Sequence, residues 1–187
     1  MRTGPEWQRT AIALGAMAVV LAAGTGLVLS VTSAPATRAS LTLTIEFNPS
    51  TWYVTVTPST LQAPAGTIVQ VTITNYDPSS HPVAASYCNV SGTVGKTMQE
   101  TYPASATGSG AAVFWLSASQ LSHTFTMMSD GYDINIPIPV ALSAQSPAVV
   151  AFSFEALQAG VTPWSSESVG VGPHGSSGDM TGLFEST

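Results

Sequence analysis

The side chains best suited to chemistry in this sequence are histidines and a methionine near the C-terminus. The chain of 187 residues has three histidines and one cysteine. His123 lies in a segment where apolar and polar residues alternate, and His174 lies in a Gly-rich stretch six residues before Met180. An imidazole and a thioether together suit a soft or borderline metal ion such as copper. We therefore treat His123, His174 and Met180 as candidate metal ligands.

The remaining histidine and the cysteine have structural interpretations. His81 follows a polar turn over residues 75–80, so we expect it at the surface. Cys88 is expected to be a small buried apolar residue, although its thiol could instead fold back towards His123. A single cysteine excludes an intrachain disulfide framework and a Cys-rich zinc site.

Composition and charge exclude several classes of protein. Only 7% of residues are charged and 44% are hydrophobic, and four Lys+Arg against ten Asp+Glu give a net charge of −6. No basic patch is available to neutralise phosphates, so we expect no binding to nucleic acid. The apolar content argues against disorder. The sequence has neither a Gly-x-Ser-x-Gly elbow nor a phosphate-binding Gly loop, so a conventional enzyme is not expected.

An apolar segment near the N-terminus predicts a membrane anchor. Residues 11–31 form a run of 21 residues without a charge, which is long enough for a helix to cross a bilayer. Arg2 and Arg9 precede the run, so residues 1–10 should be cytoplasmic. The chain is thus expected to be a single-pass protein of the cell membrane, with its C-terminal domain outside the cytoplasm. The alternative is a cleaved signal peptide, whose apolar region is usually shorter. Residues 32–39 then read as a linker, and residues 40–187 as the extracytoplasmic domain.

The outside domain has a hydrophobic period of two, which is typical of strands. We expect about seven short strands, a polar loop over residues 99–110 and no amphipathic helix. This pattern predicts an all-β fold, an antiparallel Greek-key sandwich or barrel. The expected strands cover residues 41–47, 52–56, 67–73, 123–127, 149–154 and 180–184, and the expected core includes Trp52, Val69, Val71, Ile73, Phe125, Val150, Phe152 and Phe154.

An ordered set of segments resembles the cupredoxins, the blue-copper family of Greek-key β-sandwiches. Residues 64–75 read Pro-Ala-Gly-Thr followed by a strand and an Asn, residues 122–137 resemble the segment with the first copper histidine, and residues 159–164 resemble the strand that leads into the ligand loop. The resemblance implies a cupredoxin-like β-sandwich over about residues 40–185. It also implies that His123, His174 and Met180 occupy ligand positions at one end of the sandwich.

The sequence departs from the family at the cysteine ligand. The family places this cysteine two residues after an aromatic, and here the matching residue after Trp164 is Ser166. A copper–thiolate bond defines the blue-copper site, so the copper site is expected to be degenerate, with Ser166 or Glu167 at the place of the lost ligand. The segment also resembles, more loosely, the copper domain of oxidase subunit II, but it lacks both bridging cysteines of that domain.

The resemblance implies a function of the electron-transfer type rather than catalysis. We expect a membrane-anchored, extracytoplasmic cupredoxin-like protein beside a respiratory-chain complex, with copper as the cofactor of a degenerate site. The alternative is a non-redox structural or interaction subunit, such as a subunit II-like component of a terminal oxidase that has lost its copper.

Overall fold

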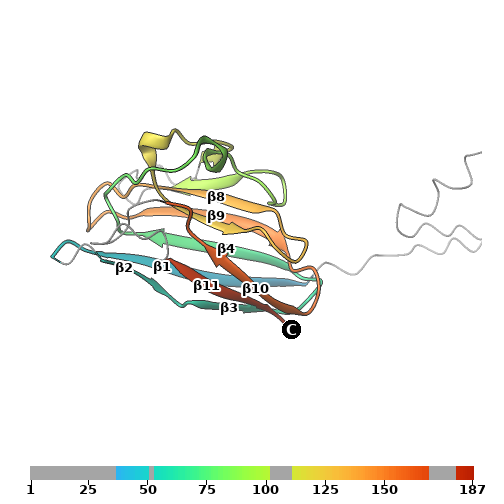
Figure 1. The fold of residues 1–187 in the computed structure, drawn as a ribbon. Coiled ribbons are helices and arrows are strands. Elements are labelled where there is room, and N and C mark those ends of the chain that lie inside the picture. The colour runs from blue at the N-terminus through green and yellow to red at the C-terminus, as the bar shows by residue number, and fades with distance from the viewer. Residues whose placement is uncertain (1–36, 51–52, 102–110, 169–179) are drawn as a thin grey trace, which may run out of the picture. The chain divides into compact units, whose positions relative to one another are not determined.

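Two β-sheets make up the part of the chain that the computed structural model describes, namely residues 37–50, 53–101, 111–168 and 180–187 (Figure 1). Two short 3-10 turns, Ala85–Cys88 and Ala118–Gln120, interrupt the strands. The strands are β1 (Arg38–Asn48), β2 (Tyr53–Thr57), β3 (Thr60–Ala63), β4 (Ile68–Asn75), β5 (Met98–Thr101), β6 (Ala111–Val113), β7 (Leu121–Met127), β8 (Ile134–Pro139), β9 (Ala148–Glu155), β10 (Gly160–Ser165) and β11 (Thr181–Ser186).

The six-stranded sheet has the order β2-β1-β4-β9-β5-β6, and β4 and β9 at its centre supply much of the core. Alternation along both strands turns every second side chain inward, where it meets its cross-strand partner. The inward pairs are Val69 with Phe154, Val71 with Phe152 and Ile73 with Val150. These six side chains and Phe125 are buried, so the predicted core is confirmed except for Trp52, which lies outside the described residues.

The five-stranded sheet has the order β3-β11-β10-β7-β8 and carries the Greek-key connection. The hairpin β7–β8 is followed by β9 in the other sheet, and β10 then returns to pair with β7. Because β8 also contacts β9, the four strands follow the spatial order β10-β7-β8-β9, with the last strand beside the first. The predicted all-β Greek-key sandwich is therefore confirmed for the described residues.

Strand direction differs from the expectation of a wholly antiparallel fold. β1 pairs with β4 in parallel, and β3 pairs with β11 in parallel. The reason lies between β2 and β3, where the chain continues past residues 58–59 and changes sheet without reversing direction. The next strand, β4, therefore runs in the same direction as β1. Period-two patterning identifies strands but does not specify the direction of their partners.

Two segment boundaries also differ from the sequence-based expectation. Gln99 to Thr101 belong to β5, which pairs with β9, so the first part of the expected polar loop is a strand. β1 begins at Arg38, inside the segment that we expected to be a linker. Within the described ranges, no helix is long and apolar enough to span a membrane, and the predicted anchor over residues 11–31 lies outside those ranges.

A glycine in β11 provides a test of the packing between the sheets. Gly182 lies opposite Trp164, and a Cβ added to it would overlap the Trp164 indole and the Ser59 carbonyl oxygen. We expect Gly182→Ala to lower the free energy of unfolding by about 1–3 kcal/mol, because overpacking forces these groups apart. The control is Gly160→Ala, since a Cβ at Gly160 meets no atom within 4 Å. Equal urea-denaturation curves for the two variants would contradict this packing.

Candidate metal centre

His123 lies in β7 with its imidazole completely buried. β7 has a register irregularity between Leu121 and His123, next to the segment that follows β4. The imidazole Nε2 of His123 is 3.0 Å from Oδ2 of Asp77, which also has no exposed surface. A buried carboxylate therefore holds one nitrogen of the predicted metal ligand.

Asp77 is held by a network of hydrogen bonds at the end of β4. The side-chain oxygen of Asn75 accepts the Asp77 backbone N–H at 3.0 Å, while the Asn75 amide donates to the Pro139 carbonyl at 2.8 Å. Oδ1 of Asp77 accepts the Ser79 N–H at 2.8 Å, and the Asp77 carbonyl accepts the Ala141 N–H at 2.8 Å. These bonds fix the carboxylate before any ligand arrives.

His81 belongs to the same cluster, so its prediction as an independent surface residue is wrong. Its Nε2 is 2.9 Å from Oδ2 of Asp77, and its ring centroid is 5.2 Å from that of His123. Only 14% of the His81 side chain is exposed. The spacing of Asp77 and His81, four residues apart after a strand that ends in Asn75, is the signal that sequence reasoning missed.

The charge states of Asp77 and His123 follow from their surroundings. Burial alone would raise the pKa of Asp77, but the hydrogen bonds from His123, His81 and the Ser79 N–H outweigh it and hold this pKa far below its ordinary value. Burial lowers the pKa of His123, and the nearby Asp77 offsets this only in part. Asp77 is therefore a carboxylate and His123 a neutral imidazole at neutral pH.

These charge states leave a free lone pair on His123. A carboxylate only accepts hydrogen bonds, so Nε2 of the neutral His123 ring carries the proton and Nδ1 carries the lone pair. Nδ1 is buried and has no hydrogen-bond partner among the described residues. A buried acceptor without a partner lowers the stability of the fold unless a hydrogen-bond donor or a metal ion engages its lone pair.

Ser166 and Met180 come together beside the strand that carries His123. The Ser166 N–H donates to the Met180 carbonyl at 2.8 Å, and the Ser166 hydroxyl accepts the Thr124 N–H at 3.2 Å. Ser166 and Met180 are buried. The structure thus places Ser166 next to the residue that follows His123 and bonds Met180 to Ser166, while His174 lies outside the described residues.

Glu167 is engaged by hydroxyl groups on the other face of β7. Its Oε1 accepts hydrogen bonds from Ser165 at 2.9 Å and from Thr126 at 3.4 Å, and its N–H donates to the Thr124 hydroxyl at 2.8 Å. Side chains alternate along a strand, so Thr124 and Thr126 share the face opposite to His123. Glu167 does not join the group formed by His123 and Asp77.

The thiol of Cys88 is free and buried, in agreement with its prediction as a small apolar residue. It packs in the hydrophobic core of the sandwich. Among the described residues, the His, Cys, Asp and Glu side chains close enough to share a metal ion are Asp77, His81 and His123, so Cys88 is not in that group.

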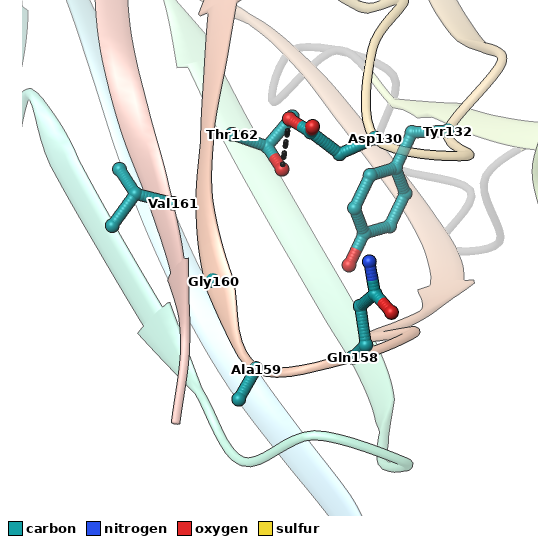
Figure 2. A pocket seen from close by; sticks show the side chains of 7 residues that line it. All are labelled: Asp130, Tyr132, Gln158, Ala159, Gly160, Val161 and Thr162. Carbon is teal, nitrogen blue, oxygen red and sulfur yellow. Dashed lines mark hydrogen bonds between the residues drawn. The ribbon is translucent and has the colours of Figure 1, made fainter.

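A pocket beside β10 involves none of these residues (Figure 2). In this pocket the Asp130 carboxylate accepts a hydrogen bond from the Thr162 hydroxyl at 3.2 Å, and the Tyr132 hydroxyl accepts the Leu157 N–H at 2.9 Å. Asp130, Tyr132 and Thr162 are thus already paired within the protein. The pocket contributes to no candidate site.

Comparison with solved structures finds copper proteins at low similarity. Reduced rusticyanin is 16% identical, with a TM-score of 0.39, over 80% of this chain and 79% of that chain. A second rusticyanin structure is 17% identical, with a TM-score of 0.38, over 80% and 78%. The multicopper oxidase McoA from the hyperthermophile Aquifex aeolicus is 10% identical, with a TM-score of 0.37, over 79% of this chain and 30% of that chain. No protein-family model and no curated protein matches the chain. Sequence identities and TM-scores this low assign no role to any residue of this chain.

The neutral state of buried His123 predicts that acid destabilises the metal-free protein. Because the pKa of His123 is lowered in the folded state, unfolding takes up a proton as the pH falls below the ordinary value of 6.5. Asp77 adds a further loss below its ordinary value of 3.8, because the carboxylate that unfolding frees binds a proton there. The free energy of unfolding should therefore decrease as the pH falls from about 7.5 to 5.

Urea titrations of wild type and His123→Gln measure this effect. The variant lacks the titrating ring, so its stability should change less over the same pH range, whatever its stability at neutral pH. An equal pH dependence in both proteins would contradict a neutral, buried His123.

Proposed function

We propose that this protein is an extracytoplasmic cupredoxin-like protein of the electron-transfer type, with a copper site that lacks the ligand cysteine. The observation that carries this proposal is the unpartnered Nδ1 of His123, a buried neutral imidazole whose other nitrogen is fixed by Asp77. Ser166 is bonded to the same strand through the Thr124 N–H, and Met180 is bonded to Ser166.

The described donors fit a copper ion in part. His123 offers an imidazole nitrogen and Met180 a buried thioether, which are donors that copper accepts. Ser166 offers a hydroxyl where the family resemblance requires a thiolate. His174 would be the second imidazole ligand in this proposal. Copper in such a set would carry one electron at a time, without the strong thiolate bond of a blue-copper site.

The protein's own contribution is to orient the imidazole and exclude water. Asp77 accepts the Nε2 proton of His123 and so fixes both the tautomer and the direction of the ring. His123, Met180 and Ser166 are all buried, which limits the access of solvent to an ion held there. Burial and hydrogen bonding of this kind tune the redox potential of a metal site.

One observation favours a second candidate function, a structural or interaction subunit without copper. The Ser166 hydroxyl accepts the Thr124 N–H and shares a hydrogen bond with the Ser168 hydroxyl at 3.0 Å. The Ser168 hydroxyl in turn donates to the Ser122 carbonyl at 3.0 Å. A serine satisfied in this way stabilises the loop without a metal ion.

The copper site is tested by restoring the missing thiolate. We expect full-length Ser166→Cys, loaded with Cu²⁺, to develop an intense thiolate-to-copper charge-transfer band in the visible range. Wild type should bind copper without this band. The matched control is Ser165→Cys. Ser165 is the last residue of β10, and its side chain points to the opposite side from that of Ser166.

Two results separate the candidate functions. Copper bound by wild type and by His81→Ala but lost in Met180→Leu supports the copper protein, and a wild type that binds no copper supports the structural subunit. A folded Ser166→Cys variant without the band would show that residue 166 does not lie at the ligand position.

The proposal also places the protein at the cell membrane, with its C-terminal domain outside and a respiratory-chain complex as its partner. The uncharged run over residues 11–31 supports this placement. We expect the full-length chain to sediment with membranes in alkaline carbonate and to be digested by protease added outside intact spheroplasts. A chain that remains protected under those conditions would contradict this orientation.

A further inference from the structure

Asp77 carries a buried negative charge without a basic side chain to balance it. Arg38 and Lys96 are the Lys and Arg residues of the described ranges, and the ion-pair contacts found there join Asp77 to His81 and His123 alone. Buried charges in proteins are normally paired with an opposite charge or coordinate a metal ion. A bound cation would supply the missing positive charge.

The donors around Asp77 are arranged as a three-ligand set. Oδ2 of Asp77 is 2.9 Å from Nε2 of His81 and 3.0 Å from Nε2 of His123, and the ligand atoms of the three residues all lie within 4.8 Å of one another. Ligands about 2.0–2.2 Å from a tetrahedral zinc ion lie roughly 3.3–3.6 Å apart. The two nitrogen–oxygen distances are slightly shorter than this spacing, and all three ligand atoms lie near enough to one another to share one ion.

We propose that Asp77, His81 and His123 form a binding site for a divalent cation of the zinc class. The ligands are one carboxylate oxygen and two imidazole Nε2 atoms, a set that Zn²⁺ accepts readily. Nε2 of His123 binds the ion through its lone pair, so the proton of that ring then lies on Nδ1. The dication then supplies the positive charge that Asp77 lacks.

The site is preorganised, and one of its ligands is accessible to solvent. The bonds from Asn75, Ser79 and Ala141 hold the Asp77 loop in place, so the loop loses little conformational entropy when an ion binds. Asp77 and His123 are completely buried, whereas His81 is partly exposed. A cation would therefore enter on the His81 side.

This site uses the opposite nitrogen of His123 from the proposed copper site. A neutral imidazole has one lone pair, so Nε2 and Nδ1 do not both bind a metal ion at the same time. The two sites thus exclude each other at His123, but their remaining ligands differ. His81 belongs to the zinc-class site and Met180 to the copper site, which allows each proposal to fail separately.

The test is calorimetric titration of metal-free, full-length protein with Zn²⁺. We expect wild type to bind one equivalent and to gain thermal stability, because a cation that binds the folded state alone raises Tm. His81→Ala should lower the affinity by more than about a hundredfold and abolish the gain in Tm. Ser80→Ala, a change in the same turn that removes no proposed ligand, is the matched control and should bind as wild type does.

The other outcomes decide between the two metal sites. A wild type that binds no Zn²⁺ overturns the proposal. Equal Zn²⁺ affinity in wild type and His81→Ala also overturns it. If His81→Ala fails to fold, as judged by circular dichroism, His81→Gln takes its place. Met180→Leu should weaken copper binding and leave Zn²⁺ binding unchanged, so the loss of one metal does not decide the other.

Discussion

The candidate centre depends on one constraint, a buried carboxylate that must be satisfied by hydrogen bonds. Asp77 lies directly after β4, and its two oxygens accept N–H groups from Ser79, His81 and His123. Without these partners an ionised carboxylate would not be stable in the interior. The requirement therefore ties the loop after β4 to β7, although 46 residues separate Asp77 from His123 in the chain.

The sandwich supplies the frame in which this constraint is met. β7 lies between β8 and β10, and its side chains are buried along its whole length. Its neighbour β10 leads to Ser166, and the backbone of Ser166 is bonded to Met180 just before β11. The pairing of β7 with β10 thus brings the end of one hairpin beside His123, so the fold positions the residues before any ion is considered.

Much of the sandwich could be predicted from the sequence because its central strands alternate regularly. β4 and β9 have one apolar face each, and a period of two shows which side chains turn inward. The direction of β3 relative to β11 could not be predicted, since it depends on where the chain changes sheet. β5 was missed because the polar residues Gln99 to Thr101 resemble a loop, although β9 pairs with them.

The candidate site was only partly predictable for a similar reason. His123 and Met180 stand out by residue type, and the resemblance to a copper family points to Ser166. Asp77 looks like an ordinary turn residue, and its role arises only when the fold places two imidazoles against it. Partnerships of this kind are tertiary, so neither composition nor periodicity records them.

The most direct measurement for the copper assignment is anomalous diffraction at the copper edge from crystals of the copper-loaded protein. The account predicts an anomalous peak about 2.0–2.1 Å from Nδ1 of His123, with the Met180 sulfur as its neighbour and Nε2 still bonded to Asp77. A copper peak remote from His123, or one lying between His81 and Asp77, would contradict the account.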